Sequence, residues 1–392
     1  MDSWKKYELQ EIISLSKEKY NPKKDKESFK CVELEHLESG TGRLLGYTDS
    51  LNQQSVKNKF NPGNVLFGKL RPYLKKYYLP DFEGVCSSEI WVLKGNEEKI
   101  SSTYLFYLIQ SNRFLQNANK SAGSKMPRAD WGYLSEVIFS IPSLREQDEI
   151  ASILLTWDRA IELKEKLVNQ KKKQKKGLMQ RLLTGEVRLH GYEEEWKSIE
   201  LKDAIARVID NRGKTPPLSS EGFELIEVNA LESNNKNPNY KKVAKYVSEE
   251  TYNSWFRNGH PQKGDILVAT VGSVGSTVIM NENRGCIAQN IIALNIKDEY
   301  NADYIYYWMN SSIYLNLIKK VLMGAVQPSL KVPHLLQFKL TIPKIEEQEK
   351  IAEILSSYDN TINLLTQEIN NLKLQKKALM QQLLTGKIRV KV

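Results

Sequence analysis

Cysteine and histidine are scarce in this chain, which has three cysteines and four histidines among 392 residues. The cysteines, Cys31, Cys86 and Cys286, are odd in number and far apart, so the sequence predicts neither a disulfide framework nor a zinc cluster. The histidines are also scattered, and none stands at a metal-ligand or catalytic-triad spacing. We therefore expect no metal site, and a reducing compartment suits the cysteines.

Long apolar runs are absent as well. No run approaches the roughly 20 residues that cross a bilayer, and the segment Met1-Asp2-Ser3-Trp4-Lys5-Lys6 lacks the apolar core of a signal peptide. We therefore expect a cytoplasmic protein without a membrane span. The net charge of +10 favours an anionic partner, with nucleic acid first and an anionic membrane surface a distant second.

Motifs for nucleotide chemistry are also missing. Arg212-Gly213-Lys214-Thr215 is similar to the end of a P-loop, but Val208 stands where a glycine is required, and Pro216-Pro217 forbids the helix that must follow. Gly272-Ser273-Val274-Gly275 follows a strand-like run with no helical pattern behind it, so a turn between strands is predicted rather than a phosphate cradle. The chain has no glycine-rich methyl-donor motif and no Asn-Pro-Pro-aromatic signature. We predict that it performs no covalent chemistry itself.

What the chain has instead is one segment that occurs twice. The first copy begins with Ile141-Pro142-Ser143-Leu144-Arg145-Glu146-Gln147, and the second with Ile342-Pro343-Lys344-Ile345-Glu346-Glu347-Gln348. The offset is 342 − 141 = 201 residues, and it holds without a gap to the ends of the copies, Leu182–Leu189 and Leu383–Val390. About half of the paired positions are identical. A long ungapped match of this kind indicates an internal repeat.

Each copy has the 4-3 apolar spacing of a coiled-coil seam. The predicted seam residues are Ile150, Leu154, Trp157, Ile161, Val168, Leu178 and Leu182 in the first copy, and Ile351, Leu355, Tyr358, Ile362, Leu365, Ile369, Leu372, Leu379 and Leu383 in the second. Lys164, Lys171 and Lys175 fall on the first seam, which argues against tight pairing near Lys171 to Lys175. Each copy is predicted to be a helix of about 36 residues, roughly 54 Å long. We expect the two helices to pair, since a lone apolar stripe would be exposed to water.

The chain is predicted to alternate between globular regions, here called heads, and repeated helices. A chain of 392 residues is too long for one core, and its 41% apolar content suffices for globular cores. The predicted parts are a first head at 1–140, a central helix at 141–190, a second head at 191–341 and a C-terminal helix at 342–392. A duplication of this kind gives a pseudo-twofold arrangement, with antiparallel helices and a head at each end. The predicted fold class is α+β.

The heads share a faint template under different side chains. Gly63-Asn64-Val65-Leu66 lies 201 residues before Gly264-Asp265-Ile266-Leu267. Residues Trp4 to Leu15 are expected to form a strand or a short helix. Thr103–Phe114 has helical spacing, and an aromatic helix is expected at Asp303–Leu317. The strand-like runs are Val65–Phe67, Ile90–Leu93, Ile266–Ala269 and Ile291–Leu294. This pattern is typical of one scaffold that presents two different surfaces.

Basic, aromatic and small polar residues form candidate DNA-binding sets in both heads. Lysine and arginine would anchor phosphates, while arginine, asparagine, glutamine and serine could read base edges. The candidates in the first head are Lys69, Arg71, Tyr73, Lys75, Ser124, Lys125 and Arg128. Those in the second head are Arg212, Lys214, Thr215, Thr270, Ser273, Asn290 and Gln327. Any one of them could be an ordinary surface residue, and the prediction depends on the whole set.

The repeated Ile-Pro-x-x-x-Glu-Gln-x-x-Ile-Ala-x-Ile-Leu and Leu-Met-Gln-x-Leu-Leu-Thr-Gly motifs resemble the conserved regions of specificity subunits of type I restriction–modification systems. The segments Val65–Leu74 and Arg212–Pro217 are similar to parts of the target recognition domains of that family. The resemblance covers the whole chain and the order of its parts.

This resemblance implies two globular α/β target recognition domains joined by two long antiparallel coiled-coil helices. Each domain would read one half of a bipartite, asymmetric site on double-stranded DNA, while the helices set the spacer and dock two modification subunits. Those methyltransferases bind S-adenosylmethionine, and a restriction subunit that uses magnesium and ATP joins them. The chain itself would be a non-catalytic DNA-binding subunit without a cofactor.

Two other classes of protein remain open from the sequence. One is a nuclease or methyltransferase whose active site is not recognised, and the other is a coiled-coil scaffold that binds only protein. Purified chain supplied with magnesium and S-adenosylmethionine would cut or methylate DNA in the first case. In the second case, duplex DNA would not affect its behaviour. The recognised bases, the spacer length and the identity of the partner subunits do not follow from the sequence.

Overall fold

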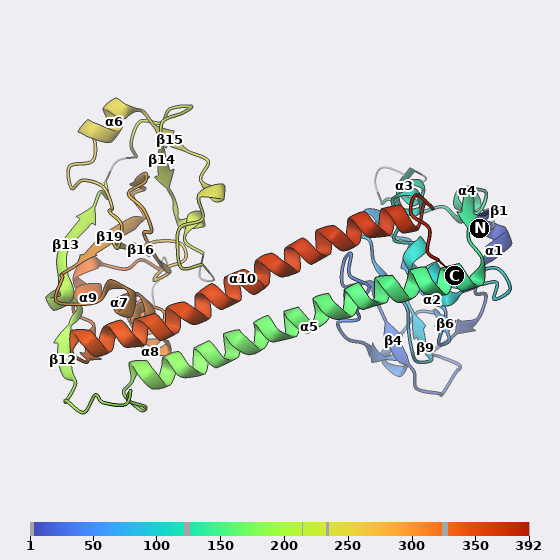
Figure 1. Ribbon diagram of the computed structural model, residues 1–392, viewed down its shortest axis with the longest axis horizontal. Helices are drawn as coiled ribbons and strands as arrows, with labels where there is room; N and C mark the ends of the chain where they lie inside the picture. The colour runs from blue at the N-terminus through green and yellow to red at the C-terminus, as the bar shows by residue number, and fades with distance from the viewer. Residues whose placement is uncertain (1–3, 121–125, 214, 233–234, 324–327, 392) are drawn as a thin grey trace. The chain divides into compact units, whose positions relative to one another are not determined.

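The computed structural model describes residues 4–120, 126–213, 215–232, 235–323 and 328–391 (Figure 1). The chain divides into two compact units, one made of Met1–Glu165 with Glu368–Val392 and the other of Lys166–Gln367. Each unit therefore combines one predicted head with a part of both predicted helices. Over the described residues, no helix is both long enough and apolar enough to cross a membrane.

Over its described residues, the head of the first unit contains three sheets, with strand orders β1-β11, β2-β10-β7-β8 and β3-β6-β9-β4-β5. Its strands are β1 (Lys5–Glu8), β2 (Ile13–Leu15), β3 (Lys19–Tyr20), β4 (Lys30–Val32), β5 (Thr48–Asp49), β6 (Lys57–Phe60), β7 (Val65–Gly68), β8 (Tyr77–Tyr78), β9 (Gly84–Cys86), β10 (Ile90–Gly95) and β11 (Ile138–Ile141). Its helices are α1 (Leu9–Ile12), η1 (Leu34–His36), η2 (Ser50–Asn52), η3 (Pro72–Leu74), α2 (Ser102–Leu108), α3 (Asn112–Lys120) and α4 (Trp131–Ser135).

The part of the second unit's head that the structure describes also has three sheets, with strand orders β12-β20, β13-β19-β16-β17 and β15-β14-β18. Its strands are β12 (Lys197–Glu200), β13 (Ile205–Asp210), β14 (Phe223–Ile226), β15 (Tyr246–Val247), β16 (Ile266–Ala269), β17 (Thr277–Ile279), β18 (Cys286–Ile287), β19 (Ile291–Ile296) and β20 (Lys339–Ile342). Its helices are η4 (Leu201–Ala204), η5 (Val228–Ala230), η6 (Tyr240–Lys242), α6 (Glu249–Ser254), α7 (Ala302–Met309), α8 (Ser312–Leu322) and α9 (Val332–Leu336).

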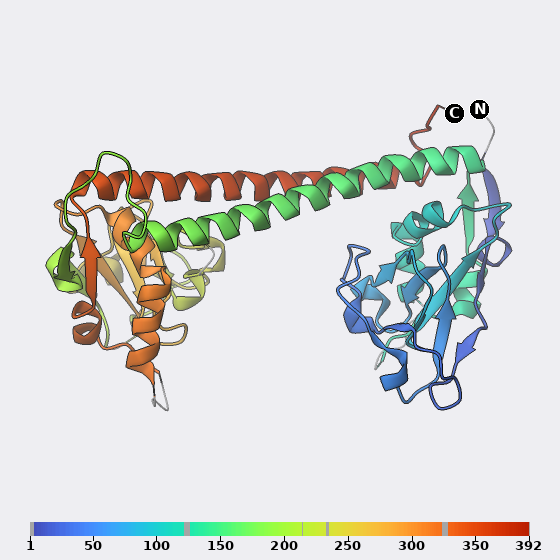
Figure 2. The same cartoon turned by 90° about the horizontal axis from the view of Figure 1, so that it is seen from below.

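The repeated segments form two long helices, α5 (Leu144–Leu183) and α10 (Ile345–Leu383). They begin just after Pro142 and Pro343, and they end before Gly185 and Gly386, whose φ angles of 71° and 70° are left-handed and suit glycine. Every predicted seam residue is buried or half-buried. Within each unit the α5 and α10 segments lie side by side (Figure 1, Figure 2).

The helix ends are part of the cores of the heads. In the first unit Leu154 and Leu383, from opposite ends of the two helices, share one buried cluster with Phe67 of the four-stranded sheet. In the second unit Leu182 and Ile351 share a cluster with the buried residues of the corresponding sheet. Removing these side chains from water contributes to the stability of helix and head together. A head and its helix segments therefore form one folding unit.

Each of the three seam lysines has a partner on the other long helix. Lys164 Nζ lies 2.6 Å from Glu368 Oε2 in the first unit. In the second unit Lys175 Nζ lies 2.6 Å from Asp359 Oδ1, and Lys171 Nζ lies 5.7 Å from the centre of the Tyr358 ring. Near Lys171 and Lys175, where the first seam is less apolar, contacts with Tyr358 and Asp359 therefore join the two helices. The sequence spacing shows which face of a helix a lysine occupies, but it does not show the partner.

One aspartate of each long helix also accepts a hydrogen bond from a tyrosine of the head. Asp158 accepts hydrogen bonds from the Tyr107 hydroxyl at 2.8 Å and from Lys376 Nζ at 2.6 Å. Asp359, 201 positions later, accepts one from Tyr307 at 2.7 Å besides that from Lys175. Burial, followed by the neighbouring carboxylate, raises the pKa of both tyrosines, so they remain protonated donors.

At the start of α5 in the first unit, a tryptophan and an arginine donate hydrogen bonds to one buried glutamate. Glu146 is almost fully buried, and Arg389 Nε and Nη2 donate to its two oxygens at 2.6 and 2.7 Å. The indole of Trp4 donates to the same carboxylate at 3.3 Å. Glu146 belongs to the motif that begins the first repeat copy, and Arg389 to the motif that ends the second.

The second unit has the same cluster with the repeat copies exchanged. Arg188 Nε and Nη2 donate to Glu347 at 2.9 and 2.8 Å, and the Trp196 indole donates at 3.3 Å. Glu347 is also buried. The beginning of each repeat copy is therefore held by the end of the other copy, which is a physical reason for the likeness of the two copies.

The predicted segments Thr103–Phe114 and Asp303–Leu317 are largely helical, but each is interrupted by a short break. The structure has two helices there, α2 and α3 in the first head and α7 and α8 in the second. The break occurs where Ser111 and Ser311 accept hydrogen bonds from the backbone N–H groups of Phe114 and Tyr314. A serine in this position starts a new helix. By contrast, the four strand-like runs form β7, β10, β16 and β19, and both proposals for residues 4–15 apply, since β1, α1 and β2 lie there.

Candidate nucleic-acid interface

In the first head, two segments with predicted DNA-binding residues are joined at one edge of the four-stranded sheet. Arg71 N–H donates to the Pro127 carbonyl at 2.7 Å, and Ala129 N–H donates to the Lys69 carbonyl at 2.8 Å. Leu70 and Arg128 form a β-bridge between these bonds. Residues 69–71 and 127–129, distant in the sequence, therefore lie side by side where β7 ends.

The short helix η3 displays the side chains of this edge. Arg71 and Lys75, the residues flanking η3, both have φ of 51°, a left-handed conformation that is uncommon for residues other than glycine. Arg71, Tyr73 and Lys75 are exposed, whereas Lys69 is half-buried. Backbone strain of this kind tends to be kept where a side chain has a function. The edge thus presents two cations and an exposed ring to solvent.

Arg128 is held in place by the carboxylate of Glu89, a residue outside the predicted set. Its Nε and Nη2 donate to the two oxygens of Glu89 at 3.0 and 3.2 Å, and this hydrogen bonding raises the pKa of Arg128. Both side chains are partly exposed to water. Nothing in the sequence pairs positions 39 residues apart. A DNA contact by Arg128 would use the part of the guanidinium that faces away from Glu89.

The predicted residues of the second head gather at the corresponding edge. Asp210, at the end of β13, pairs with Ile292 of β19, and Ala269, at the end of β16, pairs with Ile291. The segments that continue from these strands therefore start next to one another. The Thr215 hydroxyl also lies 3.3 Å from Gln289 Oε1. This edge brings together Arg212, Thr215, Ser273 and Asn290, and of these Asn290 is half-buried while the others are exposed.

Arg212 makes a chelating ion pair with Asp210, two residues before it. Its Nε lies 2.7 and 2.9 Å from the two carboxylate oxygens. Partial burial alone would raise the pKa of Asp210, but the hydrogen bonds from Arg212 outweigh it and hold the pKa below its usual value. Arg212 is therefore oriented by a fixed negative charge. An aspartate two residues before Arg212 was the feature of the sequence that could have indicated this ion pair.

Thr270 was predicted to contact DNA, and this prediction was wrong because the residue is buried. Its side chain is 1% exposed, and its hydroxyl donates to the Asn290 carbonyl at 3.0 Å. It therefore holds the edge together and has no free group for DNA. The sequence could not predict the burial of Thr270 from alternating apolar and polar residues, because the preceding strand β16 is buried on both faces and shows no such alternation. Four other candidates, Ser124, Lys125, Lys214 and Gln327, lie outside the described residues.

The two edges are equivalent positions of one scaffold. The bridge Leu70–Arg128 in the first head has a counterpart in the bridge Val271–Ser329, and both partners are shifted by 201 residues. The turn Gly272–Gly275 joins the antiparallel strands β16 and β17, which confirms the predicted strand-to-strand turn. The same backbone thus carries Lys69 and Arg128 in the first head but Thr270 and Ser329 in the second.

The cysteines and acidic residues offer no metal centre within the described parts of the chain. No group of three histidine, cysteine, aspartate or glutamate side chains there could hold a metal ion. The three cysteines are free and buried. Burial, with the nearby charge of Glu33, raises the pKa of Cys31 to about 11, so its thiol stays protonated at neutral pH.

Comparison with known proteins identifies the family. The family described as type I restriction modification DNA specificity domain matches residues 1–172 and 193–374. A putative type I restriction enzyme MjaX specificity subunit of Methanocaldococcus jannaschii is 27% identical over 100% of this chain and 95% of its own length. The MjaVIII specificity subunit of the same organism is 26% identical over 84% of this chain and 77% of its own.

Solved structures share the fold. A chain from work on complex assembly and conformational transition of the type I R-M system has a TM-score of 0.61 and 20% identity, covering 99% of both chains. The S subunit of a type I system from M. genitalium has a TM-score of 0.59 and 17% identity, covering 97% of this chain and 96% of its own. The family match covers most of the chain, which therefore belongs to the family of type I restriction–modification DNA specificity subunits, whose function is DNA recognition.

Proposed function

We propose that each unit reads one half of a bipartite, asymmetric site on double-stranded DNA. The observation that carries this proposal is the pair of equivalent sheet edges with different side chains. Arg71, Tyr73 and Lys75 project from one edge, and Arg212, Thr215 and Ser273 from the other. Cations would hold phosphates, and the arginine and hydroxyl groups would reach base edges in the major groove. Different side chains on one scaffold would read different half-sites.

The spacer between the half-sites would be set by α5 and α10, acting as an antiparallel coiled coil within a pseudo-twofold repeat. Two ion pairs support the antiparallel pairing, because Asp158 pairs with Lys376 and Lys164 pairs with Glu368. Residue numbers therefore increase along α5 as they decrease along α10. A helix of 40 residues is about 60 Å long, a length of roughly 18 base pairs. Base pairs within the spacer would not be read.

The chain would also dock two modification subunits and perform no catalysis of its own. One exposed leucine lies on each long helix at the same repeat position, Leu163 on α5 and Leu364 on α10, with 66% and 61% of their surfaces exposed. Exposed apolar side chains at equivalent positions suit two identical partners. S-adenosylmethionine would belong to those partners, and magnesium and ATP to a restriction subunit, while this chain would need no cofactor.

Replacing one of these leucines by glutamate should remove one methyltransferase subunit. We expect Leu163→Glu and Leu364→Glu each to yield a complex with one copy, and the double variant to yield none, because a charge cannot be buried unpaired in an apolar contact. Light scattering after size exclusion would give the stoichiometry. Leu374→Glu is the matched control, since Leu374 is 66% exposed but its repeat position holds Lys173. An equal loss with the control would refute the assignment.

Methylation mapping tests the function itself. In cells that carry the chain with its methyltransferase, we expect adenine methylation at one bipartite sequence, and we expect it to vanish when the chain is deleted. Purified chain with magnesium and S-adenosylmethionine should neither cut nor methylate DNA. An unchanged methylome would favour the protein-only scaffold, and activity of the purified chain would favour an enzyme.

A further inference from the structure

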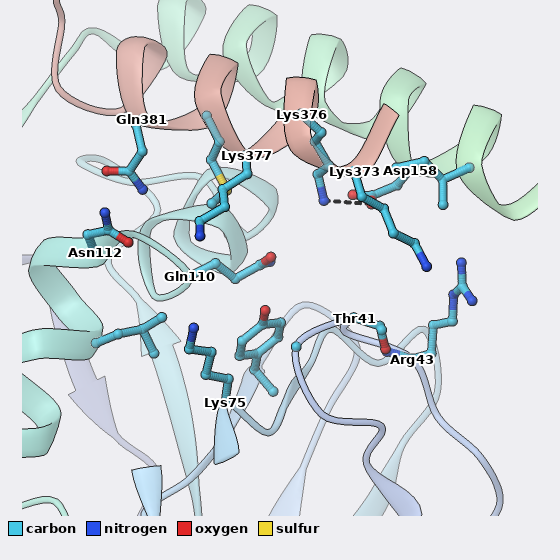
Figure 3. A pocket seen from close by; sticks show the side chains of 15 residues that line it. Thr41, Arg43, Lys75, Gln110, Asn112, Asp158, Lys373, Lys376, Lys377 and Gln381 are labelled. Carbon is cyan, nitrogen blue, oxygen red and sulfur yellow. Dashed lines mark hydrogen bonds and ion pairs between the residues drawn. The ribbon is translucent and has the colours of Figure 1, made fainter. Parts of the chain in front are cut away.

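The first unit contains a cationic cavity between the head and the long helices. Its volume is about 300 Å³, and its wall is formed by the loop after η3, the turn around Thr41, the start of α3 and the facing residues of α5 and α10 (Figure 3). Lys75 points into it from the head, and Lys377 points into it from α10 (Figure 3).

Part of the positive charge around the cavity is already neutralised. Lys376 pairs with Asp158, and Arg43 and Lys373 share Glu165. Lys75 and Lys377 differ from these, because no carboxylate of the described residues lies within ion-pair distance of either ammonium group. Two uncompensated positive charges facing one cavity repel each other, and an anion between them would relieve the repulsion.

An unsatisfied amide adds a neutral donor. The Nε2 atom of Gln381, which lines the cavity, is buried and has no hydrogen-bond partner among the described atoms. A buried donor without a partner is destabilising, because it has lost its hydrogen bond to water. An oxygen-rich ligand in the cavity would supply the missing acceptor. Ammonium and amide donors around a small cavity are the chemistry that recognises a phosphate group.

The backbone holds Lys75 at this place at some cost in strain. Its φ is 51°, and its carbonyl accepts a hydrogen bond from Gly40 N–H at 2.9 Å. Lys75 also follows η3, and Arg71 precedes η3. The cavity therefore continues the DNA-binding edge of the first head toward α10. A ligand that runs along this edge would pass from Arg71 to Lys75 and reach Lys377.

We propose that this cavity binds one phosphate of the DNA backbone next to the half-site read by the first unit. The inference rests on the proposed function and names a contact within it. Lys75 and Lys377 would neutralise the phosphate, and Gln381 would donate to one of its oxygens. The contact would be sequence-independent and would fix the position of the duplex on the head. It belongs to the first unit, because the position equivalent to Lys75 in the second is Ser276.

The experiment uses the complex of the full chain with its methyltransferase subunits and compares the wild type with K75Q/K377Q. Binding of a cognate duplex and of a duplex without the site is measured over a range of salt concentrations. Loss of one neutralised phosphate should reduce the slope of log K against log salt by about 1 and weaken both duplexes by the same factor. Lys5→Gln removes one charge from an exposed strand position of the same unit and should leave the slope unchanged.

Neutral methylphosphonate linkages then locate the contact. One position in the cognate duplex should weaken binding of the wild type and have no further effect on K75Q/K377Q. The proposal is overturned if the variant keeps the wild-type salt slope, if only the cognate duplex is weakened, or if the variant instead loses a methyltransferase subunit, which would indicate an acidic protein partner. Absence of specific binding by the wild type would count against the proposed function, whereas specific binding with an unaltered variant would count against the cavity alone. Equal melting temperatures of variant and wild type control for folding.

Discussion

Exchanging residues 1–140 for the same region of another family member is expected to replace one half of the methylated DNA sequence and leave the other half unchanged. The reason is that the predicted contacts of the first head, including Arg71 and Tyr73, all lie within this region. Those of the second head are carried by separate strands, β13, β16 and β19. Two reading surfaces without shared residues should change independently.

The structure sets one condition on this exchange. The head is fastened to the helices by Trp4 and Tyr107, which donate to Glu146 and Asp158, and by Ser101, whose N–H donates to Gln147. An incoming region needs a tryptophan and a tyrosine at the corresponding positions, or Glu146 and Asp158 each lose the donor that links them to the head and keep only Arg389 and Lys376. Methylation mapping provides the measurement, and the reciprocal exchange of residues 191–341 is the control. A change in both half-sites after one exchange would contradict the two-surface proposal.

Glu347→Ala is expected to destabilise the second unit by about 3 kcal/mol, because it removes the acceptor of a bidentate arginine from a buried position. Glu347 has a side-chain exposure of 2%, so water cannot replace it for Arg188 and the Trp196 indole. For a unit of roughly 200 residues this corresponds to a fall in melting temperature of about 6–12 °C. Glu146→Ala should have the same effect on the first unit, where Arg389 and Trp4 lose their acceptor.

Calorimetry of the purified chain would show which unit each variant destabilises, because two units that melt independently give two transitions. Glu353→Ala is the matched control, because Glu353 lies on the same helix but pairs with Lys350 at the fully exposed surface, where ion pairs contribute little. We expect no measurable change from it. If Glu347→Ala melts like Glu353→Ala, the cluster of tryptophan, glutamate and arginine is not what holds the helix ends.

The sequence by itself determined the features that depend on local spacing. The ungapped repeat located α5 and α10, the 4-3 pattern identified residues that become buried or half-buried, and short apolar runs located β7, β10, β16 and β19. Glycine and proline marked the helix limits, because their backbone preferences act within one or two residues. The same motifs were enough to indicate the family.

Only the tertiary structure decided which distant groups meet. The burial of Thr270, the pairing of Arg128 with Glu89, and the partner of Lys175 depend on contacts between segments 20 to 184 residues apart. The cationic cavity likewise needs Lys75 and Lys377, which the chain brings together from its first head and its last helix. Local propensity carries no information about such pairs, since it is the packing of apolar surfaces elsewhere that sets them face to face.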